Sequence, residues 1–327
     1  MGLAPVFAAS FLDSVEEFFG QFAEVGWLSL LLGCLFFGGF LTLRSRACFN
    51  VLRAAYPTER FAWRNIWGAY VAAYGINNVF PARFGNLVRL FLTKSSVPNS
   101  SYPAVASSFL VDNVFDLTVG VPILLFAFTQ GVFPKPPDFS KLSAFDLSYL
   151  AAHPRFTLFL LTFLGVLVLV LFAFLSVRVR AFWARVRQGV TILTDRRRYF
   201  REVYAVQAVA WVSRFAAFWC FLDAFHVGGS LRNVLLVYAV AAVSSLIPLT
   251  PGGAGVQQAL LVKVFAGAAS GATVAAYSVG QQIAIAAFSA GLGFLALAFV
   301  FRMRSFKEVI RRGREDRDRQ QAAEAAT

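Results

Sequence analysis

The sequence predicts an all-α polytopic membrane protein, and three observations lead to this fold class. The 327 residues are 58% hydrophobic and 14% charged, whereas soluble domains carry about 25% charged residues. The mean hydropathy is +0.65. Apolar stretches of about 20 residues, which is the length that crosses a hydrocarbon core about 30 Å thick, recur along the whole chain. We expect about five full spans and two opposed re-entrant helical hairpins.

Five stretches are long and apolar enough to span a bilayer. They are Val25–Leu43, Pro103–Phe128, Phe156–Val177, Tyr204–Phe225 and Ala272–Phe301. The preceding residues 1–24 are acidic and their apolar part is short, so we expect an external amphipathic segment at the interface. Residues 302–327 are predicted to form a basic cytoplasmic tail. The transmembrane domain is therefore expected at residues 25–301.

Two further apolar regions, about residues 66–93 and 233–266, are predicted to form the re-entrant hairpins. Each has two halves that are too short to cross, joined at Pro81 or at the Pro248–Gly253 break. Proline and glycine do not easily continue a helix. Non-helical backbone survives at membrane depth only where protein or a water-filled cavity covers it. Two ordinary kinked helix pairs are the alternative.

The distribution of basic residues orients the chain. Arginines follow the first span from Arg44 to Arg64, recur between residues 178 and 202, and recur again in the tail. The positive-inside rule places these segments in the cytoplasm. We expect a multi-pass protein of a bacterial or archaeal cytoplasmic (inner) membrane, with the N-terminus outside and the C-terminus inside. The first hairpin would then enter from the cytoplasm and the second from outside, which is typical of the inverted repeats of transporters.

Composition also argues against several classes of function. The net charge is +13, but it is spread between apolar segments rather than over one soluble surface, so we expect no nucleic-acid partner. Three cysteines and two histidines lie far apart, in a pattern that fits neither a disulfide framework nor a zinc site. We expect no cofactor and no metal.

Ionisable residues within predicted membrane segments are the first functional candidates, because each costs about 2.5–3.5 kcal/mol on insertion scales. Arg83 and Arg89 follow the first hairpin break. Asp112 and Asp116 are four residues apart and share a helix face. Arg214 lies near the middle of its span and is a candidate counter-ion for Asp116. Buried amides accompany them: Asn77, Asn78, Asn86, Asn113, Gln257, Gln258, Gln281 and Gln282.

This clustering of polar residues predicts one central polar cavity. The alternative is that the aspartates and arginines pair only to hold helices together. The glycines after Pro251 would open a short helix, whose free N–H groups suit a phosphate or carboxylate. Arg83 and Arg89 would add charge-assisted donors. The glycine cluster is not a nucleotide-binding loop, because no strand precedes it.

Three signatures carry a family resemblance. They are Phe80–Asn86 followed by Arg89, then Val111–Asp116, and, most specific, Pro248–Gln258 with its Pro-Leu-Thr-Pro-Gly-Gly-Ala-Gly sequence. In order and spacing they resemble the flippase-like family typified by the transmembrane region of lysylphosphatidylglycerol synthase, over residues 25 to 300. No room for an aminoacyl-transfer domain follows Arg302, so we expect a stand-alone membrane domain.

The resemblance implies a lipid translocase, since family members are associated with flipping aminoacylated phospholipids or handling other lipids and lipid-linked sugars. Together with the polar residues it gives these candidate substrate-binding residues: Pro81, Arg83, Asn86, Arg89, Asp112, Asn113, Asp116, Arg214, Thr250, Pro251, Gly252, Gly253, Gly255, Gln257, Gln258 and Gln282. The expected partners are membrane lipids carrying a phospholipid, isoprenoid or lipid-linked headgroup, with a homo-oligomer as a further option.

The chain departs from the family pattern at four of these positions. Asn86 and Gln258 stand where the family usually has Glu, and Asn113 and Gln282 where it usually has Arg. Joint loss of acids and bases is compatible with a stable fold, because a lone buried charge is what costs most. We therefore expect a lipid that is less polar or differently charged than aminoacyl-phosphatidylglycerol.

Two other functions stay open at this point. One is a non-catalytic membrane partner or regulator of a lipid-modifying enzyme, which the basic cytoplasmic segments would dock. The other is an intramembrane prenyl or phosphatidyl transferase with magnesium at Asp112 and Asp116. The membrane segments supply few further carboxylates for such an enzyme, so a transporter rather than an enzyme is expected.

Overall fold

The computed structural model describes residues 24–79, 84–132, 183–245 and 255–302. Four helices in these ranges are long and apolar enough to cross a membrane. They are α2 (Trp27–Ala55), α5 (Tyr102–Thr129), α12 (Gly271–Phe299) and the continuous helix Arg196–Ala224, which comprises α8 (Arg196–Tyr199), a π-helical turn (Phe200–Tyr204) and α9 (Ala205–Ala224). An all-α membrane protein is thereby confirmed. The predicted span Phe156–Val177 lies outside the described residues, as do residues 1–23 and 303–327.

Local sequence explains where these helices begin. Ser101 caps α5 by accepting a hydrogen bond from the N–H of Ala104 at 3.4 Å, and Pro103 occupies the first turn. Ser270 caps α12 in the same way, with the N–H of Thr273 at 3.1 Å. A side-chain oxygen at this position satisfies an N–H group that the helix itself leaves unpaired.

Helix α2 is longer than predicted, because it continues past Leu43 to Ala55. Arg44, assigned to a cytoplasmic loop, instead lies within the helix and is buried. The physical reason is that arginine is a good helix former, so a charge after an apolar run marks a change of environment and not the end of a helix. Arg44 also continues the buried face that carries Phe37 and Leu41.

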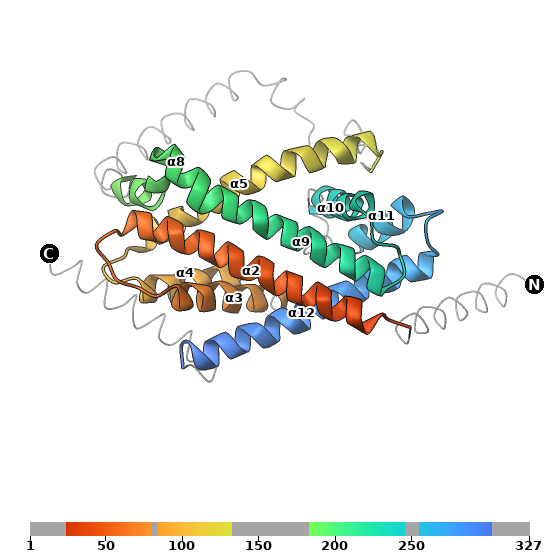
Figure 1. Cartoon of the computed structure of the whole chain (residues 1–327), viewed down its shortest axis with the longest axis horizontal. Helices are drawn as coiled ribbons and strands as arrows, with labels where there is room; N and C mark the ends of the chain where they lie inside the picture. Colours follow the sequence, from red (N-terminus) through yellow and green to blue (C-terminus); the bar gives the residue numbers. More distant parts are fainter. Residues whose placement is uncertain (1–23, 80–83, 133–182, 246–254, 303–327) are drawn as a thin grey trace, which may run out of the picture.

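The helices α2 and α9 lie side by side (Figure 1). Their backbones approach closely at Gly33, where an added Cβ would come within 2.6 Å of the ring of Phe221 and 3.2 Å of the carbonyl of Ala217. Ser213 on α9 also donates to the carbonyl of Phe36 at 2.7 Å. Small residues and hydroxyl bonds of this kind are what drive helix association in a membrane.

Two pairs of short helices complete the described fold. The pair α3 (Trp63–Val79) and α4 (Gly85–Ser96) lies in the half of the molecule where α2 ends. The pair α10 (Leu231–Ser245) and α11 (Val256–Val264) lies in the half where α2 begins (Figure 1). Residues 80–83 and 246–254, which join the members of each pair, lie outside the described ranges. The depth of these helices in a bilayer stays a prediction.

The long helices present apolar stripes away from the protein interior. Leu28, Leu31 and Leu35 are exposed along one face of α2, and Leu117 and Leu125 are exposed on α5. Residues at such spacings lie on one side of a helix. In a membrane these stripes face acyl chains.

Candidate functional site

An ion pair joins α2 to α5 inside the protein. Arg44 donates two hydrogen bonds to the carboxylate of Asp116, from Nη1 to Oδ1 at 2.7 Å and from Nη2 to Oδ2 at 2.9 Å. The indole N–H of Trp211 adds a third, to Oδ1 at 3.3 Å. Asp116 thus forms its direct ion pair with Arg44, which was predicted to lie in a cytoplasmic loop, while the predicted counter-ion Arg214 is within electrostatic range without forming an ion pair among the described residues.

A second ion pair joins α4 to α5 one helical turn away. Arg89 donates from Nη2 to Oδ2 of Asp112 at 2.9 Å, and Gln207 on α9 donates to Oδ1 at 2.7 Å. The guanidinium carbon of Arg89 lies 3.9 Å from the ring centre of Phe109 and 4.4 Å from that of Tyr70. Aromatic faces at such distances attract a cation, which strengthens the position of the arginine.

These two pairs match the alternative in which aspartates and arginines hold helices together. Asp112 and Asp116 lie on successive turns of α5, yet each carboxylate is taken by a different arginine and a second donor. A magnesium ion at these carboxylates would have to displace an arginine from each. The pairs therefore connect α2, α4, α5 and α9 into one unit.

Arg214 on α9 has no such partner. Its guanidinium carbon lies 5.0 Å from the ring centres of Phe40 and Trp211 and 5.1 Å from that of Tyr238. No carboxylate within the described ranges forms an ion pair with it, although Asp116 and Arg44 are within electrostatic range. The described interior thus holds three arginines and two aspartates, and one positive charge is left unbalanced.

Two tyrosine hydroxyls in this part of the described interior also lack a hydrogen-bond partner. The Nε of Arg214 and the hydroxyls of Tyr238 and Tyr277 are buried, and none makes a hydrogen bond of 3.5 Å or less among the described residues, although the guanidinium of Arg214 lies close enough to the Tyr238 hydroxyl to interact with it. Tyr277 is completely buried and lies close enough to Tyr238 to interact with it electrostatically. Buried polar groups normally find partners, so the unpaired Nε of Arg214 and the hydroxyl of the adjacent Tyr238 are candidate donors to an acceptor-rich group, with Tyr277 beyond Tyr238.

The other predicted site residues have separate surroundings. Asn86 accepts a hydrogen bond from Asn77 at 3.1 Å. Gln258 accepts one from the N–H of Gly255 at 2.6 Å, and so caps α11. Asn113 and Gln282 are exposed on α5 and α12, and Gln257 is half-buried. The remaining candidates lie outside the described ranges: Pro81, Arg83, Thr250, Pro251, Gly252 and Gly253.

Sequence reasoning missed several residues of this interior. Arg44 and Gln207 were not predicted as partners of the aspartates, and Tyr238 and Tyr277 were not predicted as donors. A usable signal existed for Arg44, which lies seven residues after Phe37 on the same helix face. The tyrosines gave no such signal, because a tyrosine in an apolar run is common at buried and interfacial positions alike.

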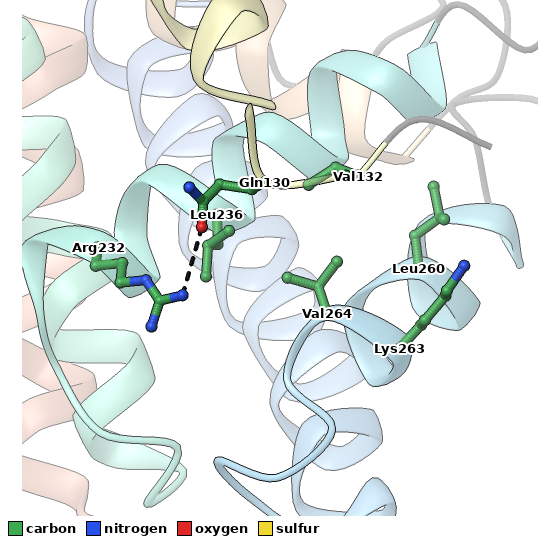
Figure 2. Close-up of a pocket in the computed structure, with 8 residues that line it drawn as sticks. Gln130, Val132, Arg232, Leu236, Leu260, Lys263 and Val264 are labelled. Carbon is green, nitrogen blue, oxygen red and sulfur yellow. Dashed lines mark hydrogen bonds between the residues drawn. The ribbon is translucent and has the colours of Figure 1, made fainter. Parts of the chain in front are cut away.

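A cavity of about 190 Å³ lies at another place, where the end of α5 meets α10 and α11 (Figure 2). Its lining residues are Gln130, Gly131, Val132, Arg232, Leu236, Leu260, Lys263 and Val264. The predicted central cavity was expected around the hairpins and the aspartate helix. Arginines occupy the space beside the two aspartates, and the cavity that described residues line lies at one end. Both hairpin breaks lie outside the described residues, so the central cavity stays a prediction.

Comparison with known families decides the relationship. The family described as "Lysylphosphatidylglycerol synthase TM region" matches residues 2–293. The chain belongs to this family. Comparisons with curated proteins and with solved structures found no match. Membership of the lysylphosphatidylglycerol synthase TM region family confirms the resemblance seen in the three signatures, and it indicates a multi-pass membrane domain with a lipid-related function.

Proposed function

We propose that the chain is a lipid translocase that moves an anionic lipid headgroup across the cytoplasmic membrane. The observation that carries the proposal is Arg214, a half-buried cation whose Nε is buried and which forms no ion pair with a carboxylate among the described residues. A lone charge in a membrane interior is costly, and natural proteins keep one where it serves a substrate or ion pathway. A headgroup phosphate would supply the missing negative charge.

The donors around Arg214 fit this substrate. A phosphodiester offers several oxygen acceptors and one negative charge, which matches the one arginine that has no carboxylate partner among the interior residues that the structure describes. The hydroxyls of Tyr238 and Tyr277 would donate to its oxygens. Acyl or isoprenoid chains would stay in the lipid phase, beside the exposed apolar stripes of α2 and α5.

The two pairs of short helices supply a route for alternating exposure. The second re-entrant hairpin, α10 with α11, would move against the unit that the ion pairs of Asp112 and Asp116 hold together, and that unit includes α4 of the first hairpin. Inverted repeats with binding at the midplane work in this way. Their placement in opposite halves of the molecule supports this reading.

A liposome assay tests the proposal. Purified protein is reconstituted with acyl-labelled phosphatidylglycerol, and a membrane-impermeant reductant then bleaches only the outer leaflet. We expect the wild type to expose inner-leaflet label faster than protein-free liposomes, with or without an imposed proton gradient. Arg214→Gln should lose this acceleration, whereas the matched control Arg53→Gln, at an exposed arginine near the end of α2, should keep it. Equal rates for Arg214→Gln and wild type would overturn the assignment of Arg214.

A further inference from the structure

The cavity between α5, α10 and α11 has the chemistry of a second anion site. Arg232 and Lys263 lie on opposite sides of it, with Leu236 and Val264 between them (Figure 2). None of its eight lining residues is acidic. Both cations are exposed, and Arg232 donates to the side chain of Gln130 at 3.4 Å. The site is therefore flanked by one cation on each side of an apolar wall.

We infer that this cleft, the Arg232–Lys263 cleft, is a docking site for the phosphate-bearing headgroup of an anionic lipid. Its volume of about 190 Å³ is well below the 300 Å³ and more of pockets that enclose a whole drug-sized ligand. It would hold a headgroup phosphate and the glycerol beside it, with the acyl chains outside. The apolar wall favours a lipid over a free phosphate ion, because an ion alone would gain nothing from Leu236, Leu260 and Val264.

The position of the cleft connects it to the half-buried Arg214. Arg232 and Tyr238 lie six residues apart on α10, which corresponds to about 9 Å along the helix. Tyr238 contacts Arg214 from the same helix whose first turns line the cleft. A headgroup leaving the cleft would therefore reach the Arg214 donors after a short passage along α10. The role of the cleft as a waiting position for transport rests on the proposed function. Its role as a lipid-binding site does not depend on that function.

Calorimetric titration of the full chain in detergent micelles tests the binding site. All proteins in the titration carry Arg214→Gln, so that the buried site contributes nothing. The probes are dioctanoyl-phosphatidylglycerol, dioctanoyl-phosphatidylcholine and inorganic phosphate. The cleft variant is Arg232→Gln with Lys263→Gln, and the matched control is Arg53→Gln with Arg60→Gln, which removes two exposed arginines elsewhere.

A cation near a lipid surface contributes about 1 kcal/mol toward an anionic lipid, so losing two should weaken phosphatidylglycerol binding about tenfold or more. We expect the control to bind as the parent does and phosphatidylcholine to bind weakly to both. Unchanged phosphatidylglycerol affinity in the cleft variant would overturn the inference. Inorganic phosphate that binds as tightly as phosphatidylglycerol would overturn the lipid assignment and leave a site for phosphate ion only.

The same variants in the liposome assay separate this inference from the proposed function. For this assay the cleft substitutions are made in the wild-type background. If the wild type moves no lipid while the cleft variant loses binding, the docking site stands and the translocase proposal fails. If the wild type moves lipid while the cleft variant binds and transports normally, the translocase stands and the docking site fails. Slower transport with weaker binding in the cleft variant supports both.

Discussion

The ion pair between Arg89 and Asp112 predicts that replacing one member lowers the stability of the protein more than replacing both. Two independent charges would not behave in this way. Asp112→Asn would leave the guanidinium of Arg89 between Tyr70 and Phe109 with no carboxylate to balance it. The side chains of Arg89 and Asp112 are only 15% and 5% exposed, so solvent cannot replace the lost partner. Breaking a buried pair by removing one member costs about 3–5 kcal/mol of stability.

Removing both charges should be much less harmful. Arg89→Gln with Asp112→Asn leaves no lone charge, and Gln207 can still donate to the amide oxygen at position 112. We expect a coupling energy of about 2–3 kcal/mol between the two substitutions, as for residues in one hydrogen-bond network. The double variant should therefore be more stable than Asp112→Asn alone.

The assay is a double-mutant cycle on unfolding in mixed micelles, followed by tryptophan fluorescence. The matched control is the pair Arg198 and Glu202, which is an i, i+4 pair with side chains 36% and 30% exposed. Its coupling should be only about 0.3–0.5 kcal/mol, as for other exposed helical pairs. Additive effects of Arg89→Gln and Asp112→Asn would refute the reasoning, because they would mean that the two charges do not sense each other.

Four further predictions concern packing, the unsatisfied donors, the helix cap and the lipid preference. Gly85→Ala should lower the melting temperature, because the new Cβ would contact the carbonyl of Ala73 and the side chain of Asn77, whereas Gly120→Ala, with nothing within 4 Å, should not. Tyr277→Phe removes a buried hydroxyl without a partner, so the free energy of unfolding should stay unchanged or rise by up to about 1 kcal/mol. Lipid transfer should slow in this variant, and an unchanged transfer rate would contradict the role of Tyr277 as a donor. Gln258→Glu should keep the cap on α11 and Gln258→Ala should lose about 1 kcal/mol, and equal thermal stability of all three proteins would argue against the cap. With Asn86→Glu added, Gln258→Glu should also change which labelled lipid is transferred in liposomes; an unaltered lipid preference would speak against a substrate difference at these positions.

The long helices could be predicted from sequence because hydropathy and length alone specify a span. Helices long and apolar enough to cross a membrane lie at four of the five predicted spans, and the fifth, Phe156–Val177, lies outside the described residues. Pro103 lies in the first turn of α5. The end of α2 could not be predicted in this way. The thickness of the membrane limits the length of an apolar run, whereas backbone geometry determines where a helix ends. Arg44 lies after the end of the apolar run and before the end of the helix, and its burial depends on Asp116, which is 72 residues away.

The sequence predicted which residues belong to the candidate site better than it predicted how those residues pair. Arg89, Asp112, Asp116 and Arg214 were singled out by charge, and all four lie in the interior of the described helices or at its edge. Which arginine meets which aspartate depends on how α2, α4, α5 and α9 pack, and no spacing along one chain encodes that. Gln258 illustrates the reverse case, because a residue selected as a substrate ligand has a local role that the capping rule explains.

The charge preference of lipid transfer tests the central claim most directly. In liposomes that contain the wild-type protein, acyl-labelled phosphatidylglycerol should cross faster than equally labelled phosphatidylcholine, and Arg214→Gln should abolish this difference. The reason is that Arg214, which is half-buried and forms no ion pair among the described residues, favours a headgroup with a net negative charge. Wild-type liposomes that transfer neither lipid faster than protein-free liposomes, under either direction of an imposed proton gradient, would contradict the account.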